Sequence, residues 1–148
     1  MREWLKVSFQ DAAWAPLLLL GAWALGDSLG LYRAVPWLDK PTHFIGGVAI
    51  AYFFHACAVH GERRIGAIPP AAMAVLVVGL TGLAAIGWEF FEFFSDALLR
   101  TQFSNGTADT LGDLFCGVAG GACYAARAVT APLTSLRTRL SSPASRAR

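Results

Sequence analysis

The sequence predicts an all-α polytopic membrane protein, built as a bundle of four transmembrane helices. Of its 148 residues, 55% are hydrophobic and only 15% are charged, whereas a soluble domain carries about 25% charged residues. The apolar residues gather in four long runs separated by short polar stretches, which is typical of membrane spans. The basic residues also divide unevenly between the two sides that four spans would create.

The four apolar runs define the expected spans. Each run has roughly the 20 residues that a helix needs to cross about 30 Å of hydrocarbon. Because lipid offers no partner for unpaired peptide groups, each run is expected to form a helix. The spans make up one transmembrane domain over residues 1–130, and they cover approximately residues 12–31, 42–59, 70–94 and 110–129.

The positively charged residues predict the orientation of the spans, because loops rich in lysine and arginine stay in the cytoplasm. We therefore expect both termini to be cytoplasmic and the loops at about 32–41 and 95–109 to face outward. The outward loops hold only Arg33, Lys40 and Arg100. The expected cytoplasmic side holds Arg2, Lys6, Arg63, Arg64, Arg127, Arg137, Arg139, Arg146 and Arg148.

The C-terminal segment, residues 131–148, is rich in serine, proline and arginine. It has too little apolar surface to form a core, so we expect a disordered, basic cytoplasmic tail. Its arginines would lie near anionic lipid headgroups. The basic cluster is short and has no interleaved aromatic residues, so the expected partner is the lipid bilayer and not a nucleic acid.

Three polar segments, at residues 39–47, 88–96 and 105–113, fall at the outer face under this topology. Within each segment the acidic and histidine residues are three or four positions apart, which places their side chains on one face of a helix. Each helix can thus direct its polar groups toward a common centre. The residues are Asp39 and His43 in the first segment, Glu89, Glu92 and Asp96 in the second, and Asp109 and Asp113 in the third.

Three of these carboxylates, Glu89, Glu92 and Asp113, lie inside their expected spans. An ionised carboxylate facing lipid costs about 2.5–3.5 kcal/mol on insertion scales, so the three together could approach about 10 kcal/mol. That cost is comparable to the whole stability of a domain. These side chains are therefore expected to face the bundle interior, to share protons or to be neutralised by a cation.

The remaining polar residues have simpler interpretations. Asp39, before Lys40 and Pro41, suits a helix N-cap, and Asp109 in a first helical turn suits the helix dipole. Asp96 fits the outer headgroup zone, and Lys40 could snorkel to the interface or pair with a nearby carboxylate. We assign Asp39, Lys40 and Asp96 a supporting role.

A mixed set of carboxylates and one histidine on facing helices predicts a divalent metal site. Carboxylate oxygens suit magnesium, calcium or manganese, and an added imidazole admits zinc or iron. The expected catalytic residues are Glu89 and Glu92. The expected metal ligands are His43, Glu89, Glu92, Asp109 and Asp113.

The combination of three motifs resembles a group of small bacterial inner-membrane proteins that includes the YjdF family and, more distantly, the VanZ-like family. The motifs are the start of the second run from Asp39 to Phe44, the Glu89-x-x-Glu92 pair, and Asp109-x-x-x-Asp113 before a glycine-rich run. The resemblance covers about residues 39–121. It implies a multi-pass protein of the bacterial inner (cytoplasmic) membrane with a polar centre.

The leading functional hypothesis is an outward-facing Asp/Glu/His site that binds a divalent cation and acts on a lipid-linked substrate. Such a protein would be a metal-dependent membrane hydrolase or transferase. Two alternatives stay open at this stage. The same residues could form a proton or cation pathway, or they could hold helices together in a structural subunit of a membrane complex.

Overall fold

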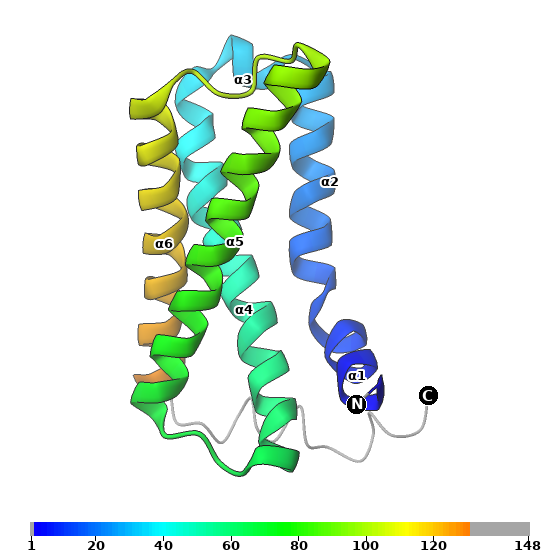
Figure 1. Ribbon diagram of the computed structural model, residues 1–148, viewed down its shortest axis with the longest axis vertical. Coiled ribbons are helices and arrows are strands. Elements are labelled where there is room, and N and C mark those ends of the chain that lie inside the picture. The colour runs from blue at the N-terminus through cyan, green and yellow to red at the C-terminus, as the bar shows by residue number, and fades with distance from the viewer. Residues whose placement is uncertain (1, 131–148) are drawn as a thin grey trace.

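The structure is a computed structural model that describes residues 2–130, and every regular element in that range is a helix (Figure 1). The expected basic tail lies outside the described residues. In chain order the helices are α1 (Arg2–Ala12), α2 (Trp14–Ser28), α3 (Leu31–Ala34), the 3-10 helix η1 (Pro36–Leu38), α4 (Asp39–Ile65), α5 (Pro70–Leu99) and α6 (Thr107–Thr130).

Two helices of the described region are both long and apolar enough to cross a membrane. They are the continuous helical segment Pro36–Ile65, which joins η1 to α4, and α5, each of 30 residues. At 1.5 Å per residue each reaches about 45 Å, which exceeds the hydrocarbon thickness of a bilayer. The all-helical prediction is confirmed, and these two helices contain the second and third expected spans.

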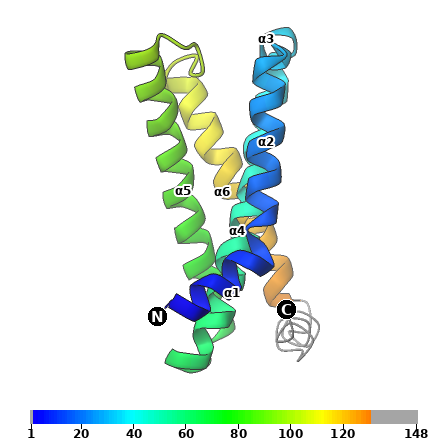
Figure 2. The same cartoon turned by 90° about the vertical axis from the view of Figure 1, so that its right-hand side faces the viewer.

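The first apolar run forms a shorter helix than its length suggests. Pro16 has no N–H to donate to the carbonyl of Ala12, so the chain bends between α1 and α2. At the other end, α2 stops before Gly30, which takes a positive φ of 70°. The resulting α2 has 15 residues, or about 23 Å, and α1 is inclined to it at the end of the bundle away from α3 (Figure 2).

The fourth run lies within α6, which has 24 residues. It is long enough to span a bilayer, but with its many glycines, Asp113 and Arg127 it is not one of the two helices that are apolar enough by composition. Four membrane-spanning helices therefore stay a prediction, with α2 and α6 as the two further candidates.

Helices α4 and α6 pack with their backbones in close approach. A Cβ atom added at Gly47 would lie 1.9 Å from the carbonyl oxygen of Gly117, and one at Gly120 would lie 2.0 Å from that of Phe44. Only hydrogen fits at these positions, as in the small-residue interfaces of membrane helices. This contact fixes α6 against α4, and it brings their polar starts together.

Large apolar side chains cover much of the surface of the described region. A contiguous apolar surface is a liability in water, but it suits contact with lipid. On α5 the exposed residues include Val75, Leu83, Phe90, Phe93 and Leu98.

The start of α4, the end of α5 and the start of α6 meet at one end of the bundle (Figure 1). The three polar segments identified in the sequence are therefore close in space. The basic residues Arg63 and Arg64 in the last turn of α4, and Arg127 in that of α6, belong to the opposite end.

Candidate functional site

Lys40 lies among three aspartates at the polar end of the bundle. Its ammonium nitrogen contacts the carboxylate of Asp109, lies 2.8 Å from an oxygen of Asp113, and lies 3.4 Å from an oxygen of Asp39. Asp113 is buried, with 2% of its side chain exposed. These ion pairs join the first turn of α4 to the first two turns of α6.

The backbone explains how Lys40 reaches α6. Its aliphatic stem crosses Gly112, where an added Cβ would lie 3.1 Å from the Lys40 Cε atom. Asp109 is held from its other side, since the backbone N–H and the side-chain amide of Asn105 both donate to its Oδ2. Lys40 and Asn105 therefore hold the Asp109 carboxylate from two sides.

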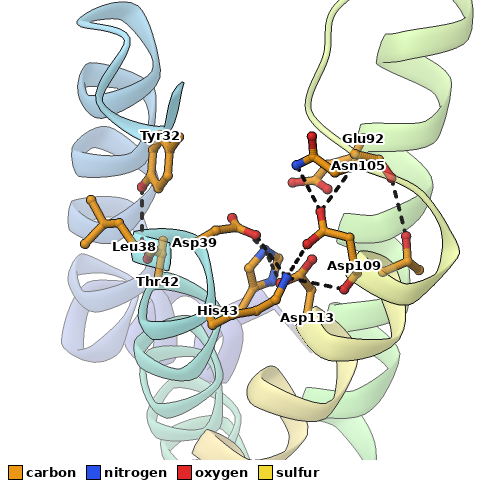
Figure 3. Close-up of polar contacts among 12 residues, drawn as sticks. Tyr32, Leu38, Asp39, Thr42, His43, Glu92, Asn105, Asp109 and Asp113 are labelled. Carbon is orange, nitrogen blue, oxygen red and sulfur yellow. Dashed lines mark hydrogen bonds and ion pairs between the residues drawn. The ribbon is translucent and has the colours of Figure 1, made fainter. Parts of the chain in front are cut away.

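His43, one turn after Asp39, faces carboxylates with both ring nitrogens. Its Nε2 lies 3.5 Å from Asp39 Oδ1 and 3.6 Å from Asp113 Oδ1. Its Nδ1 lies 4.0 Å from Glu89 Oε1 on α5. Figure 3 shows Asp39 and His43 of α4 facing Asp109 and Asp113 of α6.

Asp39, His43 and Asp113 can each offer one ligand atom so that all three atoms lie within 4.8 Å of one another. Two carboxylate oxygens and one imidazole nitrogen are ligand atoms that divalent metals bind in proteins. The sequence spacing places Asp39 and His43 on one helix face, but it assigns Asp39 only a supporting role. Its central place is the main addition of the structure to the candidate ligand set.

The other expected ligands have different partners. Asp109 binds Lys40 and Asn105. Glu92 accepts a hydrogen bond from the indole Nε1 of Trp88 at 2.8 Å. Glu89 lies near the Nδ1 side of the His43 ring, whereas Asp39 and Asp113 lie near its Nε2 side. Both glutamates are buried, with side chains no more than 9% exposed.

Asp96 lies apart from this cluster and organises the loop between α5 and α6. Its two oxygens accept hydrogen bonds from the hydroxyl of Thr101 at 2.6 Å, the N–H of Phe103 at 2.9 Å and the N–H of Ser104 at 3.0 Å. The loop begins at Arg100, which has a left-handed φ of 57°. Asp96 therefore positions the start of α6.

Two further polar pairs lie in the other half of α4. His55 Nδ1 lies 2.9 Å from the hydroxyl of Tyr124 on α6. His60 Nε2 lies 3.2 Å from Asp11 Oδ2 on α1. The sequence pattern gave no reason to pair His60 with Asp11, because they lie 49 positions apart in the chain.

The comparisons with known proteins agree with this architecture. The family described as "Predicted membrane protein (DUF2238)" matches residues 3–132. A relative from Thermotoga maritima, named "Uncharacterized protein", is 31% identical over 103 residues, which are 68% of this chain and 50% of the relative. The chain thus spans about half the length of that relative. No solved structure matches this chain. The chain belongs to the DUF2238 family of predicted membrane proteins, which confirms its resemblance to the YjdF family.

Proposed function

We propose that this protein binds a divalent cation at its polar end and acts on a lipid-linked substrate there. The observation that carries the proposal is the convergence of Asp39, His43 and Asp113 from two helices, with three potential ligand atoms within 4.8 Å. Three protein ligands would leave coordination positions for water and substrate, as in catalytic metal sites.

The charge balance supports a cation at this place. When ionised, Asp39, Asp109 and Asp113 carry three negative charges, and the single ammonium of Lys40 contacts all three. Two negative charges then lack a counter-charge among these four groups, and one divalent cation would balance them. In a membrane environment such a charge is costly unless it is compensated.

The position of Glu89 also supports a metal at His43 Nε2. Metal-bound histidines usually donate their other ring N–H to a carboxylate, which orients the ring and raises its basicity. Glu89 Oε1 lies 4.0 Å from His43 Nδ1, so a small shift of either side chain would form that hydrogen bond. Glu89 would then be a positioning residue.

The chemistry we propose is hydrolysis or group transfer. A bound divalent ion would polarise a phosphoryl or carbonyl oxygen and would lower the pKa of a bound water. Glu89 and Glu92 are the nearby buried carboxylates that could accept a proton. The VanZ-like resemblance remains a hypothesis that rests on the sequence motifs alone.

The proposed setting is the bacterial inner membrane, with α2, α4, α5 and α6 as four spans and both termini in the cytoplasm. The distribution of arginine and lysine supports this orientation, because the polar site lies at the end that is poor in basic residues. The site would then face the outer leaflet, within reach of lipid-linked substrates.

Metal analysis of the purified protein tests the proposal. Protein incubated with zinc, and then freed of unbound ions, should retain about one equivalent of zinc by mass spectrometry. His43→Ala should lose it, because one of three ligands is removed. His55→Ala is the matched control, since it removes another histidine from α4, and it should keep the zinc. Absence of zinc in the wild type, or equal retention in the two variants, would reject a metal site at His43.

A second candidate function, a proton pathway, is favoured by the polar pairs in the inner half of α4. His55 with Tyr124 and His60 with Asp11 continue the polar residues toward the end opposite the site. Polar groups placed along a span are typical of proton relays. Liposomes containing the protein and a pH-sensitive dye should then acidify faster than empty liposomes after an external acid pulse, and His60→Ala should abolish the difference. Equal rates with and without protein would exclude this function.

A further inference from the structure

A cavity of about 260 Å³ lies between α2, α4 and α5, and Gly117 of α6 contributes to its wall. It begins beside His43 and extends along the helices toward Leu17 and Ile50. The candidate metal site and the cavity therefore share one residue, His43.

Small residues and one aromatic contact create this space. On α4, Gly46 and Gly47 line the cavity with no side chain, and on α5 Ala84 and Ala85 add only methyl groups. At its outer end α2 meets α5 through Trp23, whose ring centre lies 4.8 Å from that of Trp88. The rest of the cavity lies on the inner side of this contact, toward Leu17 and Ile50.

The cavity is apolar over most of its length and polar near one end. Leu17, Leu19 and Leu20 line the α2 wall. The hydroxyl of Thr81 donates to the carbonyl of Val77 in its own helix, and so it is already satisfied. Among the residues that line the cavity, His43 is the ionisable one.

We infer that this cavity holds one hydrocarbon chain of a membrane lipid, with the polar end of that lipid against His43. A cavity of about 150 Å³ accommodates benzene, so one of 260 Å³ has room for about ten chain carbons by proportion. A helix, about 10 Å across with its side chains, is too wide for this space. The occupant is therefore a flexible chain and not a further helix.

A bound hydrocarbon chain makes a lipid the substrate class of the proposed site. The chain would enter between the lipid-facing helices, and the group that follows it would lie beside Asp39, His43 and Asp113. That the bound lipid is the substrate rests on the proposed function, whereas binding of the chain rests on the cavity alone.

Photo-crosslinking tests the inference. The protein is reconstituted in phosphatidylcholine vesicles with a monoacylglycerol that carries a diazirine in its acyl chain, a probe with no charge of its own. After illumination, mass spectrometry should place the adducts on cavity residues such as Leu19, Ile50 and Ala84. Ala84→Phe fills the cavity and should lower the adduct yield there about tenfold, the factor that corresponds to about 1.4 kcal/mol of steric cost.

The control is Ala72→Phe, the same substitution at an exposed position near the other end of α5, and it should leave the yield unchanged. Ala84→Leu is a smaller filling change for the case in which Ala84→Phe does not fold. Adducts spread evenly over exposed residues such as Val75 and Leu83, or an unchanged yield in the filled variants, would overturn the inference.

Zinc retention in the same preparations separates this inference from the proposed function. The filled variants keep Asp39, His43 and Asp113, and so they should keep zinc. If the wild type retains zinc but shows no labelling in the cavity, chain binding is refuted and the metal proposal is not. Cavity labelling in a wild type that binds no zinc would refute the metal proposal alone.

Discussion

Replacing Lys40 with methionine removes the ammonium but keeps an unbranched stem over Gly112. The variant would leave Asp113, which has 2% of its side chain exposed, without the cation that lies 2.8 Å away. Removing one partner of a buried ion pair costs about 3–5 kcal/mol. The pair with Asp109 is more exposed, and it adds at most about 1 kcal/mol.

We expect Lys40→Met to lower the free energy of unfolding by about 3 kcal/mol, the lower end of the range for a buried pair, because the Lys40 side chain is itself 36% exposed. The assay is loss of helical circular dichroism as sodium dodecyl sulfate is titrated into protein held in a mild detergent. Lys6→Met, an exposed position in α1, is the matched control.

The double variant Lys40→Met, Asp113→Asn separates the ion pair from other effects. Without the buried charge, it should recover part of the lost stability, with a coupling energy of about 1–3 kcal/mol. A Lys40→Met protein within about 0.5 kcal/mol of the wild type would refute the reasoning, since the ion pairs would then contribute nothing to joining α4 and α6.

Three further predictions follow from the same geometry. Gly47→Ala places a methyl group against Gly117 and should destabilise the protein by about 1–3 kcal/mol. Gly79→Ala, at a position with open space around it, should leave the stability unchanged. Detergent titration measures the stability of both variants. Asp96→Ala should speed hydrogen exchange of the loop amides that it binds, while exchange in the middle of α4 stays the same. Lys40→Met should bind zinc about tenfold more tightly in a calorimetric titration, because a competing positive charge is gone. Weaker binding would contradict the proposed competition.

Helical spacing and charge placement made the polar end of the molecule predictable. His43, Glu89 and Asp113 stand at helical intervals from other acidic residues in three separate segments, and the topology inferred from basic residues put those segments on one side. The structure brings the three side chains close together. No long-range information was needed for this step, because antiparallel helices joined by short loops leave few other arrangements.

The choice of partners within the site could not be read from the sequence. Glu92 is one turn from Glu89, but it accepts a hydrogen bond from Trp88, a residue of its own helix. Asp39 looked like a cap, yet its side chain faces His43 and Lys40. Such choices depend on the rotation of each helix about its axis. The close approach of glycines on α4 and α6 sets this rotation, and residue spacing alone does not reveal it.

The first helical segment shows another limit of pattern reading. Residues 12–31 are almost continuously apolar, so hydropathy alone predicts a single span. The missing N–H of Pro16 and the positive φ of Gly30 shorten the regular helix to Trp14–Ser28. Local backbone chemistry thus decided the length of α2, and apolar content did not.

X-ray absorption of zinc-loaded protein tests the central claim most directly, because it reports the atoms bound to the metal. We predict nitrogen and oxygen neighbours at about 2.0–2.2 Å, with the scattering pattern of one imidazole that disappears in His43→Gln. A spectrum dominated by sulfur at about 2.3 Å, or an imidazole signal that persists in His43→Gln, would contradict a metal site built from Asp39, His43 and Asp113.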